Sequence, residues 1–132
     1  MTSTLTAGSA CKPNISASGR RRRRLLGIAG FGAALATGVV LIAFHVEWYW
    51  RAIGVFVPAL VGASGLLQAR RSTCIARARD GTFENEDSTT TKMADIDVRA
   101  SRKVGEAISR DVLVIGVIAA AIAAATAVVP LP

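Results

Sequence analysis

The chain has 132 residues, 52% of them hydrophobic and 19% charged, and its formal net charge is +7. This length suits one small domain, and a soluble domain of this size could not bury so much apolar surface in its core. A bilayer accepts such surface, so the composition favours a membrane protein. The basic residues are separated by apolar runs, which indicates that their positive charge serves a membrane and not a nucleic acid.

The N-terminal region combines a polar tail with a basic cluster. Residues 1–19 are rich in Ser, Thr, Gly and Ala and lack periodicity, which predicts a disordered tail. Five consecutive arginines then precede a membrane-length apolar segment, so we interpret them as a positive-inside anchor that also attracts anionic lipid headgroups. The alternative is a nucleic-acid-binding arm. The anchor residues are Arg20, Arg21, Arg22, Arg23 and Arg24.

The first predicted span covers residues 25–44, which carry no charge. Twenty helical residues cover about 30 Å, the thickness of the hydrocarbon core. Small residues at Gly30, Ala34 and Gly38 form a stripe that would let another helix pack closely, although Gly and Ala are also common in membrane helices generally. Residues 20–36 resemble a cleaved twin-arginine signal as well, but hydrophobicity continues past the candidate cleavage site, which favours an uncleaved span.

The second predicted span covers residues 52–69 and forms a hairpin with the first. Pro58 removes one backbone donor in its middle, so we expect a kink there. Gly62 offers close packing against the first span. Arg70 and Arg71 follow the apolar run and mark the return of the chain to the cytoplasm.

Aromatic side chains gather in the turn between these two spans. Trp and Tyr favour the headgroup level, where the ring is in contact with lipid and its N–H or O–H stays hydrated. His45 and Glu47 lie in the same turn, but one histidine and one carboxylate make a poor metal site. We therefore expect no metal and no cofactor. The predicted interface residues are Trp48, Tyr49 and Trp50.

Polar side chains gather at the inner end of the second span, at Gln68, Arg70 and Cys74, and we treat them as a candidate functional edge. They belong to a Gln-Ala-Arg-x-x-Thr-Cys run. Together with Trp-x-Trp-Arg at residues 48–51 and the proline in the middle of the helix, this run resembles an uncharacterised family of small bacterial membrane proteins over residues 45–81. The resemblance implies no activity, but it implies that the three edge residues form a unit.

Cys74 is the one residue of this edge that could be chemically reactive. Arg71 and Arg77 flank it in the sequence, and positive charge beside a thiol favours a reactive cysteine. The alternative is a small residue that packs at the membrane edge and has no reactive role.

Residues 72–111 form the predicted cytoplasmic loop. Residues 82–91 are acidic and polar without an apolar face, which predicts a flexible segment. In residues 92–110, apolar side chains recur at three- and four-residue steps among basic ones, which indicates an amphipathic helix at the membrane surface or against a partner. This helix could run directly into the third span, residues 112–129. The small-residue stripe of the third span is Gly116, Ala120 and Ala124.

The distribution of basic residues predicts the topology. Only Arg51 of the sixteen lies between the first two spans; the others lie before the first span or between the second and third. The positive-inside rule then places the N-terminus in the cytoplasm and the C-terminus outside. We predict an all-α protein of the bacterial inner membrane, with three transmembrane helices, the first two a hairpin within residues 20–71, and a cytoplasmic amphipathic helix.

The residue pattern contains no recognisable catalytic site. The three spans have no ionisable side chain, and no nucleophile–base pair, phosphate loop or metal cluster is present. We therefore expect a non-catalytic accessory or assembly subunit, which packs through its small-residue stripes against itself or against a larger membrane complex. The alternatives are a small oligomeric transporter or pore, and a thiol-dependent membrane enzyme that uses Cys74.

Overall fold

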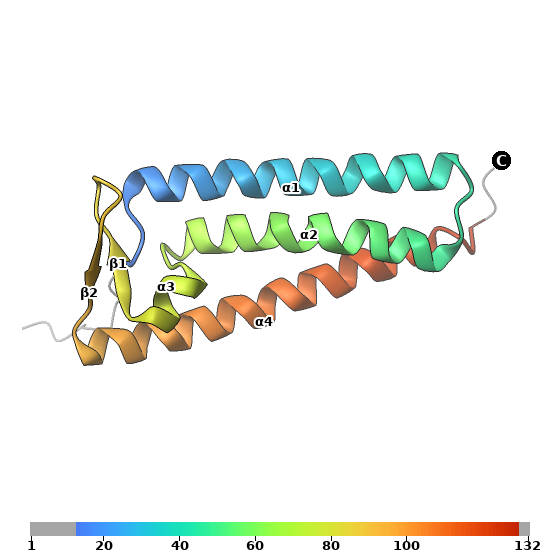
Figure 1. The fold of residues 1–132 in the computed structure, drawn as a ribbon. Helices are drawn as coiled ribbons and strands as arrows, with labels where there is room; N and C mark the ends of the chain where they lie inside the picture. Colours follow the sequence, from blue (N-terminus) through green and yellow to red (C-terminus); the bar gives the residue numbers. More distant parts are fainter. Residues whose placement is uncertain (1–12, 130–132) are drawn as a thin grey trace, which may run out of the picture.

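Three long helices run along the molecule in the computed structural model, which describes residues 13–129. Helices α1 (Ala17–Ala43) and α2 (Trp48–Arg70) form an antiparallel hairpin, and α4 (Asp95–Ala125) crosses α2 obliquely on its other side (Figure 1). All three are long and apolar enough to cross a membrane. The prediction of a mostly helical chain with three such helices is confirmed.

The start of α1 corrects the predicted disordered tail. Ser16 caps the helix because its hydroxyl accepts a hydrogen bond from the N–H of Gly19, at 3.1 Å. Asn14 and Ile15, just before the cap, are buried. The prediction is therefore wrong for residues 13–19, and residues 1–12 lie outside the described part of the chain. The arginine run sits inside the first turns of α1 and not ahead of the helix.

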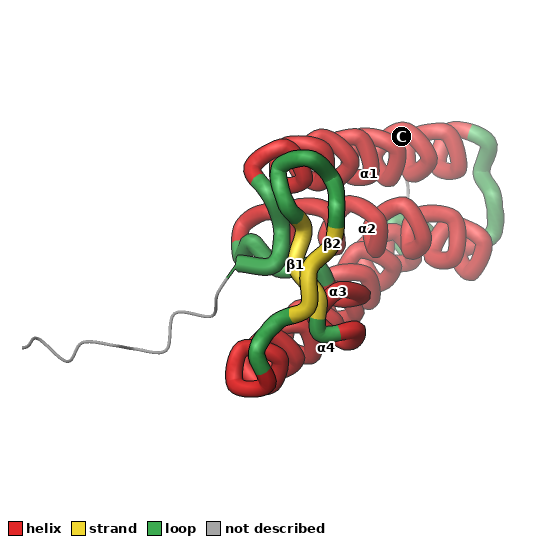
Figure 2. Tube along the Cα trace, turned by 60° about the vertical axis from the view of Figure 1, so that its left-hand side comes forward, coloured by secondary structure: helices red, strands yellow, loops and turns green. Residues whose placement is uncertain are grey.

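A small folded unit replaces the predicted loop after α2. The short helix α3 (Ile75–Asp80) ends at Gly81, whose φ of +67° is a left-handed conformation that glycine adopts easily. Strands β1 (Thr82–Glu84) and β2 (Thr90–Lys92) then pair in antiparallel fashion. Figure 2 shows this β-hairpin lying across one end of the helices. The expectation of a flexible segment over residues 82–91 was therefore wrong.

Local hydrogen bonds stabilise the turn of this β-hairpin. The Thr89 hydroxyl donates to the Asp87 carboxylate at 2.6 Å, and the Thr89 N–H donates to the same oxygen at 3.1 Å. Both bonds favour the charged carboxylate and lower the pKa of Asp87. The Asn85 side chain also donates to the hydroxyls of Thr89 and Thr91. These bonds explain why a segment without an apolar face still forms a turn with fixed geometry.

The predicted amphipathic helix and the predicted third span are one continuous helix, α4. Asp95 and Asp97 lie in its first turn, where carboxylates interact favourably with the helix dipole. Ser101, Gly105 and Ile108 form its buried face beside α3. The helix ends at Ala125 instead of residue 129.

The interior of the bundle is built from small side chains. Ala59 and Ala63 of α2 are 0% and 1% exposed, and Ala34 of α1 packs with Val55 and Ala59 in the core. Large apolar side chains point outward instead, for example Leu35, which is 73% exposed. This inverts the usual arrangement of a soluble domain and suits helices that contact lipid on their outer faces.

Candidate functional site

A buried polar cluster joins the N-terminal segment, the end of α2 and helix α4. Its centre is Asn14, which is 0% exposed. The Asn14 side-chain amide donates to the carbonyl of Cys74 and to the hydroxyl of Ser101, both at 3.1 Å, and its side-chain oxygen accepts from the Cys74 N–H at 2.6 Å. The backbone of Asn14 also bonds the carbonyl of Ser72 and the N–H of Glu84. One asparagine therefore joins its own segment to three others that are distant in the sequence: residues 72–74, β1 and α4.

Arg23 forms the second part of the cluster. One guanidinium nitrogen donates to the side-chain oxygen of Gln68 at 2.6 Å, and another donates to the sulfur of Cys74 at 3.1 Å. Gln68 passes the network on, because its own amide donates to the Ser64 hydroxyl at 2.6 Å. Gln68 and Cys74 are only 7% and 6% exposed. The start of α1 is thereby tied to the end of α2.

The predicted edge residues are only partly brought together. Gln68 and Cys74 meet through Arg23, but Arg70 is exposed and lies outside the cluster. The two arginines that flank Cys74 in the sequence pair with carboxylates elsewhere: Arg71 with Asp111 at 2.6 Å, and Arg77 with Glu84 at 3.4 Å. The cation beside the thiol is Arg23, which the sequence does not place near Cys74.

Three members of the cluster were missed at the level of sequence: Asn14, Arg23 and Ser101. Only for Arg23 does the sequence contain a pattern that could have predicted its place in the cluster. It lies four residues before Gly27 and seven before Gly30, so the helical period puts it on the face of α1 that packs against α2.

The chemistry of this cluster is that of a structural joint. In the described part of the chain, every buried side-chain nitrogen or oxygen has a hydrogen-bond partner. The same residues contain no group of three or more His, Cys, Asp or Glu side chains that could hold a metal ion. A fully satisfied polar network stabilises one arrangement of the segments that it joins.

Removal of the Arg23 side chain should expose Cys74. In a Cys11→Ser background, Arg23→Ala is expected to raise the rate of maleimide labelling at Cys74 roughly tenfold, because the hydrogen bond from Arg23 to the thiol is lost together with the bond that holds Arg23 on Gln68. Arg22→Ala is the matched control, since Arg22 is exposed and adjacent. Equal labelling rates in the two variants would show that Arg23 does not protect the thiol.

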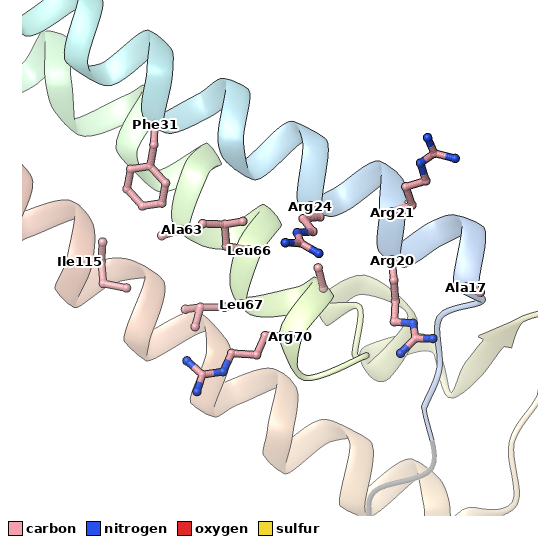
Figure 3. A pocket seen from close by; sticks show the side chains of 11 residues that line it. Ala17, Arg20, Arg21, Arg24, Phe31, Ala63, Leu66, Leu67, Arg70 and Ile115 are labelled. Atoms are coloured by element: carbon pink, nitrogen blue, oxygen red, sulfur yellow. The ribbon is translucent and has the colours of Figure 1, made fainter.

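A basic groove lies beside this cluster. It has a volume of about 730 Å³ and is lined by residues of α1, α2 and α4. Arginines line one end, and Phe31, Leu66 and Ile115 line the apolar remainder (Figure 3). The arginines at the groove are Arg20, Arg21, Arg24 and Arg70.

Most of the predicted packing residues are used within the chain. A Cβ atom on Gly30 would lie 2.5 Å from the backbone nitrogen of Gly62, so the two helices touch there. Gly116 leaves room for the side chain of Leu60 of α2, and Gly38 faces Val55. Ala34 is in the core, while Ala120 and Ala124 are half-buried. Helix α2 continues unbroken through Pro58.

The aromatic residues lie at the opposite end of the molecule from the arginine run. Trp48, Tyr49 and Trp50 start α2 and are 44–57% exposed. Trp48 and Tyr49 contact each other edge to face, with ring centroids 5.8 Å apart. Arg51 is buried beside them, where it donates to the carbonyl of Val46 and to the hydroxyl of Thr126. This basic residue therefore fixes the turn to the end of α4.

Comparisons with protein-family models, with curated proteins and with solved structures find no match. The resemblance noted for residues 45–81 stays an expectation.

Proposed function

We propose that the chain is a non-catalytic integral protein of the bacterial inner membrane, with a cytoplasmic N-terminus and an external C-terminus. Its role is that of an accessory or assembly subunit. It packs through the side of α1 that α2 leaves uncovered against a membrane helix of a second copy or of a larger complex. The three apolar helices and the position of the arginines support the membrane location and the orientation.

The observation that carries the proposal is an uncovered small-residue face on α1. Gly32 is exposed, and a Cβ atom built on it would have no neighbouring atom within 4 Å. Ala29, Ala33 and Ala36 share that face and are exposed as well. The face points away from Gly30, which packs against α2. We call these four residues the outer face of α1.

Such a face has a specific use in a bilayer. Small residues four apart, here at positions 29 and 33 and at positions 32 and 36, let the backbones of two helices approach closely and gain van der Waals contact. Leu25 and Val40 flank the outer face and are 58% and 51% exposed, so they would form the rim of the contact. The stripe that the sequence suggested for partners, around Gly30, is occupied by α2 instead.

The alternative functions gain no comparable support. A pore needs polar groups toward a lumen, but the Ser64 hydroxyl accepts from Gln68 and the Thr126 hydroxyl donates to the Ala123 carbonyl. A thiol enzyme needs an accessible nucleophile, and Cys74 is buried under Arg23.

Site-specific photo-cross-linking tests the proposal. A photoreactive residue at position 40, on the rim of the outer face, is expected to give a cross-linked species of higher mass in the native membrane. The same residue at position 57 is the control, because Val57 is 58% exposed on α2 and away from the outer face. Mass spectrometry of the product distinguishes a second copy from another subunit. A monomer with lipid adducts alone at both positions would refute the proposal.

A further inference from the structure

We propose that the basic groove binds an anionic phospholipid, with the phosphate at the arginines and one acyl chain along the apolar wall. The groove combines two chemistries in one cavity of about 730 Å³: guanidinium groups at the end of the bundle, and apolar side chains toward its middle. The same combination characterises a phospholipid, whose charged headgroup is joined to a hydrocarbon chain. The site is separate from the outer face of α1 and does not require a protein partner.

The charge at the groove is uncompensated by the chain itself. Among the residues that the structure describes, no carboxylate forms an ion pair with any arginine of the groove. Arg71 and Arg77, which lie outside it, do pair with carboxylates. Arg20 has one weak contact, to the Ser72 hydroxyl at 3.4 Å. A carboxylate at the rim, that of Glu86, accepts from the N–H of Ala17 at the start of α1 and not from an arginine of the groove.

The arrangement of the arginines suits a phosphate group. Arg20 and Arg24 extend from α1 toward the end of α2, Arg70 extends from α2 toward α4, and Arg21 points away from α2 (Figure 3). The guanidinium group binds phosphate through parallel N–H donors, and it carries its charge at every physiological pH. Guanidinium groups from two helices therefore line the same groove.

The apolar part of the groove makes a lipid a better ligand than a soluble anion. Leu66 and Leu67 of α2, Phe31 of α1 and Ile115 of α4 continue inward from the arginines. Phe31 lies seven residues after Arg24 in α1, which corresponds to a rise of roughly 10 Å along the helix. Phe31 also lines a second, almost wholly apolar cavity of about 310 Å³ farther along the same three helices. An acyl chain placed among these side chains has an apolar path beyond the first cavity.

A specific site can be told apart from general attraction to a negative surface. Each arginine near the surface is worth roughly the same in general attraction, wherever it lies. Arg22 belongs to the same run but does not line the groove. Loss of an arginine of the groove should therefore reduce binding, whereas loss of Arg22 should leave most of it.

Native mass spectrometry of the full chain in mild detergent provides the test, with dioleoyl phosphatidylglycerol and dioleoyl phosphatidylcholine as probes. We expect the wild type to retain phosphatidylglycerol in preference to phosphatidylcholine. Arg24→Gln/Arg70→Gln should weaken phosphatidylglycerol binding by roughly 30-fold, to the level of phosphatidylcholine. The control Arg22→Gln/Arg99→Gln removes the same charge outside the groove and should keep the preference.

Two further arms complete the test. Protection of Cys74 from maleimide in a Cys11→Ser background reports that each variant is folded. If the double variant does not fold, Arg24→Gln alone replaces it in the binding test. Glycerophosphoglycerol, which is the headgroup without acyl chains, should not compete at millimolar concentration. The proposal is overturned if both double variants lose phosphatidylglycerol equally, if neither does, or if the free headgroup competes as well as the lipid, which would indicate a phosphate site only.

Discussion

Gly30→Leu is expected to destabilise the hairpin of α1 and α2 by about 3 kcal/mol or more. A Cβ atom on Gly30 would lie 2.5 Å from the nitrogen and 2.7 Å from the Cα of Gly62, and 3.1 Å from the carbonyl oxygen of Pro58. These are backbone atoms, so a change of rotamer cannot relieve the clash, and the helices must separate. Maleimide labelling of Cys74 as a function of the SDS mole fraction reports this separation, because Arg23 of α1 covers the thiol of Cys74 just after the end of α2.

Gly32→Leu is the control for this prediction. It makes the same substitution two residues away, at a position where an added Cβ atom meets no atom within 4 Å. The labelling midpoint should stay the same or rise slightly, since leucine is a better helix former than glycine by up to about 1 kcal/mol. In the separate photo-cross-linking experiment, Gly32→Leu should abolish the cross-link from position 40 if the outer face of α1 contacts the partner. Equal midpoints for Gly30→Leu and Gly32→Leu would contradict the close contact at Gly30.

The membrane-length helices were predictable because their signal is local. An uncharged run of about twenty residues, bounded by arginines or by aromatic residues, is a property of composition over a short window. The small β-hairpin was missed for the converse reason. Its strands have three residues each, and their Thr-rich sequence reads equally well as a polar loop. Only the hydrogen bonds of the folded turn decide between the two.

The small-residue stripes show a second limit of sequence reasoning. Helix α1 is so rich in Gly and Ala that it carries small residues at a spacing of four on two opposite faces. The stripe through Gly30 packs against α2, and the stripe through Gly32 is left open. The spacing is the same on both, so the sequence indicates that close packing occurs but not which face is already filled.

The polar cluster was beyond sequence reasoning because its contacts are long-range. The Asn14 side chain reaches Cys74 across 60 residues and Ser101 across 87. Nothing about an asparagine in a polar N-terminal segment distinguishes it from its exposed neighbours. Its role depends on Cys74 and α4 lying against the segment that precedes α1, which only the tertiary structure defines.

Asn14→Ala should therefore destabilise this end of the protein by about 2–4 kcal/mol. The substitution removes three side-chain hydrogen bonds and leaves the N–H of Cys74 and the Ser101 hydroxyl without these partners in a buried site, while the Cys74 carbonyl keeps its bond from the Ala78 N–H. An unsatisfied buried polar group costs more than the bond itself contributes. Hydrogen exchange at the Cys74 amide should accelerate by at least tenfold, and Cys74 should become accessible to maleimide at a lower SDS fraction.

Asn85→Ala is the control that tests whether the cost of Asn14→Ala comes from burial or from the loss of hydrogen bonds as such. The Asn85 amide also donates two hydrogen bonds, to Thr89 and Thr91 at 2.8 and 2.9 Å, but it does so at the surface of the β-hairpin. Water can replace those bonds, so the loss should stay below about 1 kcal/mol. A large cost for Asn14→Ala beside a small one for Asn85→Ala would show that the buried cluster holds the N-terminal segment, α2 and α4 together. Similar small costs for both would mean that the apolar contacts of the helices suffice, and that the cluster adds little to the stability of this end.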